Sequence, residues 1–335
     1  MKKLISVILC LLLALSALSG CASPAPSEKA AEGKLSIVAT IYPIYDWVLQ
    51  ILGDRADQAQ VTLLMDGGVD LHSFQPSVDD IVRISTCDLF LYVGGESDDW
   101  AEAALKEATN KNMLSISLMG TLGDSVKEEE IVEGMEHDHD HDEEHEDHDD
   151  GHDHDEPEYD EHVWLSLKNA AVLCRAIAAA LGQIDEEHRA AYAANADAYI
   201  EKLDGLDGQY RAAVEASGHR TLLFGDRFPF RYLTDDYGLG YYAAFVGCSA
   251  ETEASFETVV FLANKLDELG LPAILQIEGS DGSIARTILE NAKSENLSIL
   301  TLDSMQSVTA QTGAARGGYL GIMEKNLEVL KAALG

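Results

Sequence analysis

The segment DEEHRAAYAANADAYIEKLDGLDGQYRAAVEAS, residues 185–217, sets the architecture that the rest of the chain adopts. Its apolar side chains recur at alternating steps of four and three, as expected for one face of a helix; they are Tyr192, Ala196, Tyr199, Leu203, Leu206, Tyr210 and Ala213. A helix of about thirty residues is roughly 45 Å long, enough to run the length of a two-lobed protein. Gly205 and Gly208 weaken this pattern without removing it. We therefore predict a stiff linking helix over residues 185–217.

Strand and helix patterns alternate on the N-terminal side of this helix, over residues 34–184. Ser77, followed by Asp80, has the pattern of a capping box that opens one of the helices. The predicted strands are 35–40, 61–65, 88–93 and 113–119, and the helices between them start near Pro43, Ser77 and Ser97. Such alternation predicts an α/β lobe with a mostly parallel sheet flanked by helices.

The same alternation returns after the linking helix, over residues 218–335. The predicted strands are 221–224, 241–246, 273–277 and 298–302, and the predicted helices are 229–238, 256–269, 283–292 and 319–334. The chain of 335 residues is long enough for two domains. We therefore predict two α/β lobes with mostly parallel sheets, joined by the linking helix.

The first lobe carries a histidine-rich acidic segment, which reads EHDHDHDEEHEDHDDGHDHDEPEYDEHVW over residues 136–164. Such a composition buries too little apolar surface to order the chain, so a disordered loop is predicted over residues 127–160. Imidazole and carboxylate together suit zinc first, with copper, nickel and cobalt as competitors. We expect low-affinity metal binding by its seven histidines, the alternative being an acidic solubilising loop; they are His137, His139, His141, His145, His148, His152 and His154.

The net charge of the chain is −36, to which this loop contributes heavily. A chain this acidic attracts cations and is not expected to bind nucleic acid. Three cysteines remain beyond residue 21, an odd number without the spacing of a disulfide framework or a thiolate zinc site. Cys87, Cys174 and Cys248 are therefore interpreted as core residues.

The N-terminus has the pattern of a targeting segment. Residues 1–20 combine two lysines with an apolar stretch too short to span a membrane permanently. The sequence Leu18-Ser-Gly-Cys21 resembles a bacterial lipobox, in which the cysteine is lipidated, whereas the alternative is plain secretion. Residues 21–33 read as a flexible tether. We expect a protein anchored by lipid on Cys21 to the outer face of a cell membrane.

A selective metal site requires fixed ligands, and these must come from the folded lobes. His72 lies in a loop just after the second predicted strand, and His162 lies at the entrance of a helix, beside residues that should pack. In the second lobe Asp226, Glu278 and Asp303 each follow a predicted strand. Because ligands gather beyond the carboxyl ends of parallel strands, these carboxylates are candidates to line a cleft opposite the two histidines.

These motifs resemble the metal-binding lipoproteins that deliver zinc or manganese to ABC importers. Asp70-Leu-His-Ser-Phe-Gln-Pro-Ser77 resembles the first ligand loop of that family, and Asp160-Glu-His-Val-Trp-Leu165 resembles the second, which follows a His-rich insertion in zinc members. The segment Tyr92-Val-Gly-Gly-Glu96 and Trp100 are also similar. The resemblance covers nearly all of the chain beyond its N-terminus and implies two α/β lobes joined by one rigid helix.

The chain departs from the zinc pattern in the second lobe, where zinc members carry a histidine before a Phe-x-Tyr segment. Here Phe230-Arg-Tyr232 follows Asp226-Arg227, and an arginine stays protonated and cannot bind metal. The resemblance therefore implies oxygen ligands from this lobe: Asp303 first, Glu278 second and Asp226 as a substitute. Two histidines with two carboxylates also come close to the manganese members, but the His-rich loop favours zinc.

The function that these features predict is capture of zinc in the cleft between the lobes and delivery to an ABC importer permease. A manganese-binding protein of the same class and a surface metal buffer or adhesin without a permease are the alternatives. A zinc hydrolase is disfavoured, because the sequence has neither an HExxH helix nor a serine nucleophile elbow. We expect a monomer with no enzymatic activity.

Overall fold

The computed structural model describes residues 34–135, 158–249 and 253–335, and Leu35–Gly335 forms one compact unit. The predicted signal peptide, Cys21, the tether and the seven histidines of the predicted loop lie outside the described residues.

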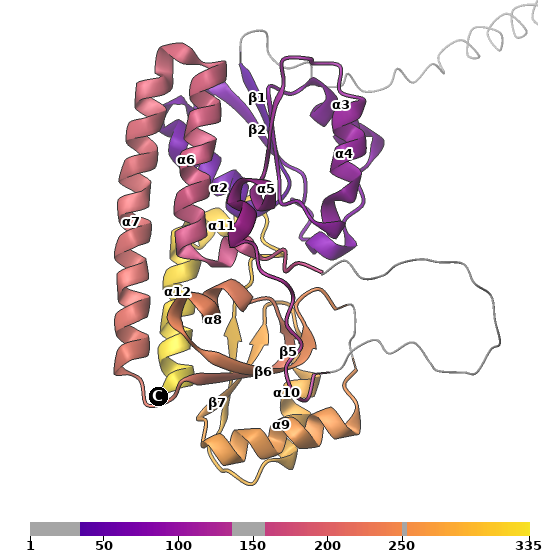
Figure 1. Cartoon of the computed structure of the whole chain (residues 1–335), viewed down its shortest axis with the longest axis vertical. Helices are drawn as coiled ribbons and strands as arrows, with labels where there is room; N and C mark the ends of the chain where they lie inside the picture. The colour runs from indigo at the N-terminus through magenta and orange to yellow at the C-terminus, as the bar shows by residue number, and fades with distance from the viewer. Residues whose placement is uncertain (1–33, 136–157, 250–252) are drawn as a thin grey trace, which may run out of the picture. The chain divides into compact units, whose positions relative to one another are not determined.

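The first lobe is built on a four-stranded parallel sheet with the strand order β2-β1-β3-β4 (Figure 1). Alternate side chains of the central strands point to opposite faces, so that Ile37 faces one core and Val38 the other. Helices α2 and α6 (Leu167–Ile184) cover the first of these faces, and α3 and α4 the second. The strands are β1 (Leu35–Ala39), β2 (Ala59–Leu63), β3 (Leu89–Tyr92) and β4 (Leu114–Ser117), and the helices are α2 (Tyr42–Leu52), α3 (Val78–Thr86), α4 (Asp99–Lys106) and α5 (Leu118–Leu122).

The second lobe repeats this plan with the strand order β6-β5-β7-β8, again parallel throughout. Leu222 and Phe224 face a core shared with α12, whereas Leu223 faces α9 and α10. The strands are β5 (Thr221–Phe228), β6 (Gly240–Val246), β7 (Ala273–Ile277) and β8 (Ser298–Leu302), and the helices are α8 (Arg231–Tyr237), α9 (Phe256–Leu269), α10 (Ser283–Asn291), α11 (Ala310–Ala315) and α12 (Gly318–Leu334). The predicted fold class is confirmed.

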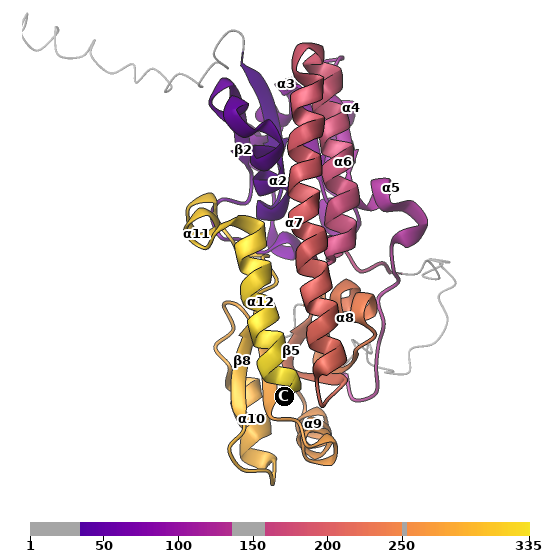
Figure 2. The same ribbon diagram turned by 90° about the vertical axis from the view of Figure 1, so that its left-hand side faces the viewer.

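The predicted linking helix is α7 (Arg189–Ala216), which follows a short 3-10 turn. It runs beside α6 (Leu167–Ile184) along the first lobe and continues beside α12 of the second (Figures 1 and 2). Six of the seven side chains of the predicted stripe are buried, and Ala213 is partly buried against the same core. Helix α6 is long and apolar enough to cross a membrane, but more than half of it is buried inside the fold, as in a core helix.

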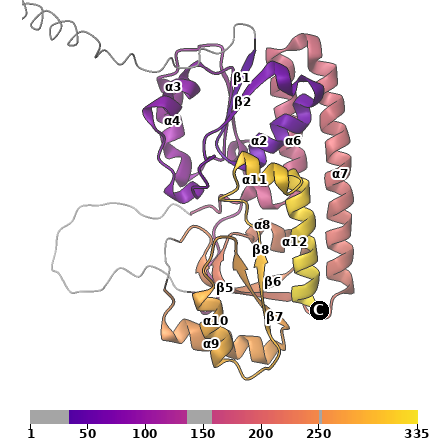
Figure 3. The same ribbon diagram turned by 180° about the vertical axis from the view of Figure 1, so that it is seen from behind.

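The two lobes share a single apolar core around α12, which packs on α7 and on β7 and β8 (Figure 3). Tyr319 of α12 packs edge-on against Trp47 of α2, and its hydroxyl donates to the Trp164 carbonyl at 2.7 Å. Trp164 Nε1 in turn donates to the carbonyl of Ser304 at 2.8 Å. Trp164 precedes α6 and Ser304 follows β8, so buried contacts tie the lobes together next to the linking helix.

The ends of the predicted disordered loop are ordered, which corrects its boundaries. Residues 127–129 pair antiparallel with residues 158–160, with the Glu129 N–H donating to the Glu158 carbonyl at 2.8 Å. Tyr232 of the second lobe donates through its hydroxyl to the Asp160 carbonyl at 2.7 Å. Backbone pairing and contacts to the second lobe hold the polar residues of these ends, and Met135 is buried in the apolar core. Composition alone does not reveal such contacts.

Candidate metal site

His72 lies in a 3-10 turn, η3 (Leu71–Ser73), in the loop that follows β2. Asp70 caps this turn by accepting a hydrogen bond from the His72 backbone N–H at 3.0 Å. Ser97 Oγ lies 2.8 Å from His72 Nδ1, and Glu161 Oε2 lies 3.6 Å from the same nitrogen. Nδ1 is therefore engaged, and Nε2 points away from these partners.

His162 is wholly buried at the start of the turn that leads into α6. Asp160 Oδ1 accepts from the His162 backbone N–H at 2.8 Å and lies 3.1 Å from ring Nδ1. Trp164 packs beside the ring, with centroids 5.2 Å apart. Gly247 of the second lobe comes so close that an added Cβ would lie 3.1 Å from His162 Cε1. These contacts hold the ring with Nε2 directed away from Asp160.

The two predicted histidines are brought together, with their Nε2 atoms 3.2 Å apart. Two nitrogens bound to a tetrahedral zinc ion at about 2.0–2.1 Å lie about 3.3 Å from one another, so the pair already has the spacing of two ligands. The carboxylates of Asp160 and Glu161 lie on the Nδ1 sides of the rings. Such partners orient metal-binding histidines and increase their basicity.

The protonation of the pair follows from the same surroundings. Burial and the neighbouring His162 lower the pKa of His72 to about 3. Burial disfavours a charged His162, but the carboxylates of Asp160 and Glu161 favour it, and together with hydrogen bonding they raise the pKa of His162. A metal ion bound between the same nitrogens requires both imidazoles to be neutral, because a protonated ring nitrogen has no lone pair to offer.

Cys248 approaches the pair from the second lobe, where it follows β6. Its Sγ and a ring nitrogen of each histidine all lie within 4.8 Å of one another. The interpretation of Cys248 as a core residue is wrong, because it is only partly buried, whereas Cys87 and Cys174 are buried as predicted. Among the residues that the structure describes, this trio is the group of histidine, cysteine and acidic side chains that converges as metal ligands do.

The structure does not bring Asp303 or Glu278, the first two carboxylates expected as ligands, into this group. Asp303 Oδ1 accepts from the Met305 N–H at 2.9 Å, and its Oδ2 is paired with Arg316. Glu278 Oε2 accepts from the Ser304 N–H at 2.7 Å, so its carboxylate is also engaged within the second lobe. Burial raises the pKa of Glu278.

Asp226, the substitute ligand, is engaged as well. It lies within β5 and not after it, because the strand continues to Phe228 past an irregularity in its pairing with β6. Its carboxylate accepts from the backbone N–H groups of Arg227 and Ile277, at 2.8 and 3.2 Å. All three predicted carboxylates thus accept hydrogen bonds from backbone N–H groups of their own lobe.

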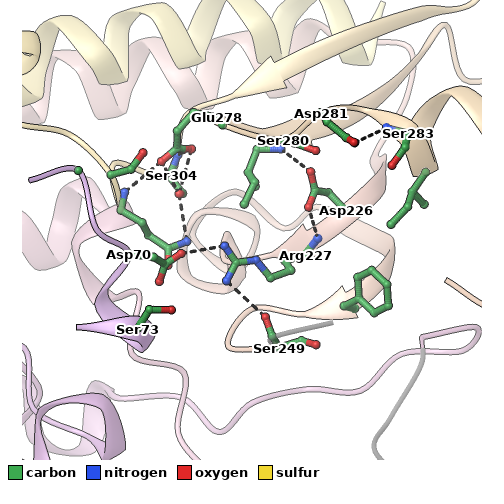
Figure 4. A pocket seen from close by; sticks show the side chains of 17 residues that line it. Asp70, Ser73, Asp226, Arg227, Ser249, Glu278, Ser280, Asp281, Ser283 and Ser304 are labelled. Atoms are coloured by element: carbon green, nitrogen blue, oxygen red, sulfur yellow. Dashed lines mark hydrogen bonds and ion pairs between the residues drawn. The ribbon is translucent and has the colours of Figure 1, made fainter. Parts of the chain in front are cut away.

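Arg227 links the loop of His72 to the loop of Cys248 (Figure 4). Its Nη2 donates to Asp70 Oδ2 at 2.8 Å, and its Nη1 donates to the Ser249 carbonyl at 3.3 Å. The hydrogen bond and positive charge of Arg227 lower the pKa of Asp70, although burial of the carboxyl group acts in the opposite direction. A cavity of about 530 Å³ opens beside this ion pair; its lining includes Asp70, Arg227, Glu278, Ser280 and Ser304.

Sequence reasoning missed Cys248 because a lone cysteine after a strand has no spacing motif. The signal that could have pointed to it is its position. Like His72, it follows the carboxyl end of a strand in a parallel sheet, where ligand-binding loops gather. A second signal was the lack of a histidine before Phe230-Arg-Tyr232, where the sequence resembles the zinc-binding family in other respects.

Comparisons with known proteins match most of the chain. Residues 37–333 match the family described as zinc-uptake complex component A, periplasmic. The chain is 32% identical over 305 residues to the zinc-binding lipoprotein AdcA of Streptococcus pneumoniae serotype 4, covering 91% of this chain and 57% of that protein. It is 29% identical over 301 residues to the high-affinity zinc uptake system protein ZnuA of Bacillus subtilis, covering 90% and 88%. The chain thus spans little more than half the length of AdcA.

Solved structures show the same fold. The Zn(II)-bound ZnuA-like domain of Streptococcus pneumoniae AdcA superposes with a TM-score of 0.68 at 27% identity, covering 90% of this chain and 99% of that domain. The periplasmic zinc-binding protein TroA of Treponema pallidum gives a TM-score of 0.69 at 21% identity, covering 90% and 100%, which supports the fold alone.

Proposed function

Because this chain belongs to the family of zinc-uptake complex component A, periplasmic, we propose that it captures zinc outside the cytoplasm and delivers it to the permease of an ABC importer. The observation that carries this proposal is the His72–His162 pair, whose Nε2 atoms face one another at 3.2 Å. Asp70 and Asp160 hold the backbones of these histidines. The site is therefore organised before metal arrives, which avoids an ordering cost on binding.

The family is one of uptake components and not of enzymes, in agreement with the expectation from sequence. A transport protein has to hold its ion until it meets the permease, whereas a catalytic zinc keeps a position open for water. The family and its relatives are named for zinc, which supports zinc over the manganese alternative. Cells that lack this chain should lose zinc uptake if it delivers zinc to a permease. They should keep zinc uptake if it is only a surface metal buffer or an adhesin.

In this proposal the His-rich segment collects zinc weakly and passes it to the fixed site. The ordered ends of the segment support the transfer. The Asp160 N–H donates to the Lys127 carbonyl at 2.9 Å, and the side chain of the same Asp160 holds His162. Zinc that leaves the segment at this end is released next to a ligand of the site.

The first test deletes residues 136–155, which removes all seven loop histidines and leaves His162 with its packed neighbours. We expect zinc stoichiometry to fall to one ion, while the affinity of the tightest site stays nearly unchanged. The reason is that the sequence of this segment predicts disorder, and an ion that binds a disordered chain must also order it, so these sites are expected to be weak.

Calorimetric titration with zinc and then with manganese measures both quantities, using protein purified without added metal. Disappearance of the tightest binding event with the deletion would place the selective site in the loop. Tighter binding of manganese than of zinc would favour the manganese alternative.

We also propose that the protein is anchored to the outer face of the membrane by lipid on Cys21. The lipobox-like Leu18-Ser-Gly-Cys21 supports this anchor, and the pneumococcal relative is named a lipoprotein. We expect Cys21→Ala to move the protein from the membrane fraction to the soluble or secreted fraction, as measured by fractionation and immunoblotting. Cys87→Ala, a change at a buried cysteine of the first lobe, is the matched control and should stay with the membrane. A Cys21→Ala protein that is processed normally and stays membrane-bound would contradict the anchor.

A further inference from the structure

We propose that Cys248 is the ligand that the second lobe contributes, so that zinc is bound by two imidazole nitrogens and one thiolate sulfur. This inference rests on the proposed zinc site and specifies its chemistry. Cys248 Sγ and one ring nitrogen each of His72 and His162 lie within 4.8 Å of one another. The two histidines belong to the first lobe and the cysteine to the second, so the three ligands bridge the lobes.

The distances are close to those of a bound ion. With zinc–nitrogen and zinc–sulfur bonds of about 2.0–2.1 and about 2.3 Å, nitrogen and sulfur ligands of one tetrahedral ion lie about 3.6 Å apart. A sulfur–nitrogen separation within 4.8 Å therefore has to shorten by about 1.2 Å at most for both atoms to bind one ion. Gly247 makes this approach possible, because its missing side chain lets the loop lie against the His162 ring.

Arg227 positions the cysteine and does not bind the metal. A guanidinium stays protonated and has no lone pair to offer. Its two hydrogen bonds, to Asp70 and to the Ser249 carbonyl, connect the residue two before His72 with the residue after Cys248. The side chain thus clamps the two ligand loops together across the lobes (Figure 4).

The thiolate also determines which ion the site prefers. As the zinc–sulfur bond forms, the Cys248 thiol loses its proton to solvent, because the thiolate is the species that binds metal. Sulfur ligands favour zinc and disfavour manganese, which takes oxygen ligands. A site with Cys248 therefore selects zinc more strongly than the two-histidine, two-carboxylate set expected from the sequence.

The test uses Co²⁺ as a spectroscopic probe, in the full chain purified in detergent. A cobalt–thiolate bond produces intense near-ultraviolet charge-transfer absorption that imidazole and carboxylate ligands do not produce. We expect this absorption to appear with the first equivalent of Co²⁺ and to be absent in Cys248→Ser. Cys87→Ala is the matched control and should keep it, because Cys87 is buried at the end of α3.

Zinc affinity provides the second readout, measured by chelator competition. Loss of a residue that hydrogen-bonds a metal ligand typically costs about 10–100-fold in metal affinity, so we expect Cys248→Ser, which removes a ligand itself, to cost at least that much. Cys248→Asp, which replaces sulfur with oxygen, should reduce the preference for zinc over manganese. Thermal unfolding without metal should be similar for all variants, which separates ligand loss from misfolding.

The outcomes separate this inference from the proposed function. Tight zinc binding that is unchanged in Cys248→Ser, with the cobalt–thiolate absorption retained or never present, would overturn the role of Cys248 and leave the two-histidine site intact. Absence of tight zinc binding in the unmodified chain would instead overturn the proposed function itself.

Discussion

His162→Ala is expected to weaken zinc binding at the tight site by more than about 100-fold, because loss of a direct ligand exceeds the effect of losing a residue that merely supports one. His72→Ala should have an effect of the same order, since the two Nε2 atoms share one position for the ion. Competition titration against a chelator, in protein lacking residues 136–155, measures this affinity without contributions from the loop.

Two further variants test whether the loss of zinc affinity is specific to the two proposed ligands. His219→Ala removes a partly exposed histidine at the start of the second lobe and should leave zinc affinity unchanged. Asp160→Asn keeps the shape of the partner of His162 but removes its charge, and we expect a loss of about 10–100-fold. If the double variant of His72 and His162 binds zinc as tightly as the unmodified protein, the site lies elsewhere.

Trp164→Ala is expected to lower the free energy of unfolding by about 3–5 kcal/mol, the range for removing a large buried aromatic side chain. Trp164 is fully buried, and it contacts the second lobe through the Ser304 carbonyl and the Tyr319 hydroxyl. It also packs against the His162 ring, so zinc affinity should fall together with stability. Urea unfolding followed by circular dichroism measures the first effect, and chelator competition measures the second.

Trp164→Phe is the matched control for this prediction. It keeps most of the apolar burial but loses the indole N–H, which leaves the Ser304 carbonyl without that partner at a cost of about 1–3 kcal/mol. We therefore expect an intermediate stability. A Trp164→Ala protein as stable as the unmodified chain would show that the core between the lobes contributes little to stability.

The elements of this fold were predictable because their signals are local. Alternating strands and helices follow from apolar periodicity over short windows. The stripe from Tyr192 to Tyr210 marks α7 in the same way, and its burial against α6, α2 and α12 confirms it. The ordered ends of the His-rich segment were not predictable, because contacts with residues such as Tyr232 hold them and their own composition does not.

The first-lobe half of the site was also accessible from sequence. His72 and His162 stand within short motifs whose neighbours, Asp70 and Asp160, hydrogen-bond them from two residues away. Such local bonding appears as a motif in the sequence. Asp303, in contrast, follows its strand as predicted but folds back to accept from the Met305 N–H and to pair with Arg316. A carboxylate after a strand can turn toward a cleft or toward its own loop, and sequence position does not distinguish the two.

Two parallel α/β lobes, a rigid helix between them and two histidines on one lobe can be predicted from the sequence alone, because periodicity and short motifs act over a few residues. The group that approaches these histidines from the second lobe is known only once the lobes are packed together. Cys248 is 86 residues from His162 along the chain, and it reaches the site because β6 ends there, Gly247 lets the loop pack on the ring and Arg227 bridges to Asp70. This contact between Cys248 and the histidines depends on how the two sheets pack beside α7, and no local sequence pattern specifies that packing.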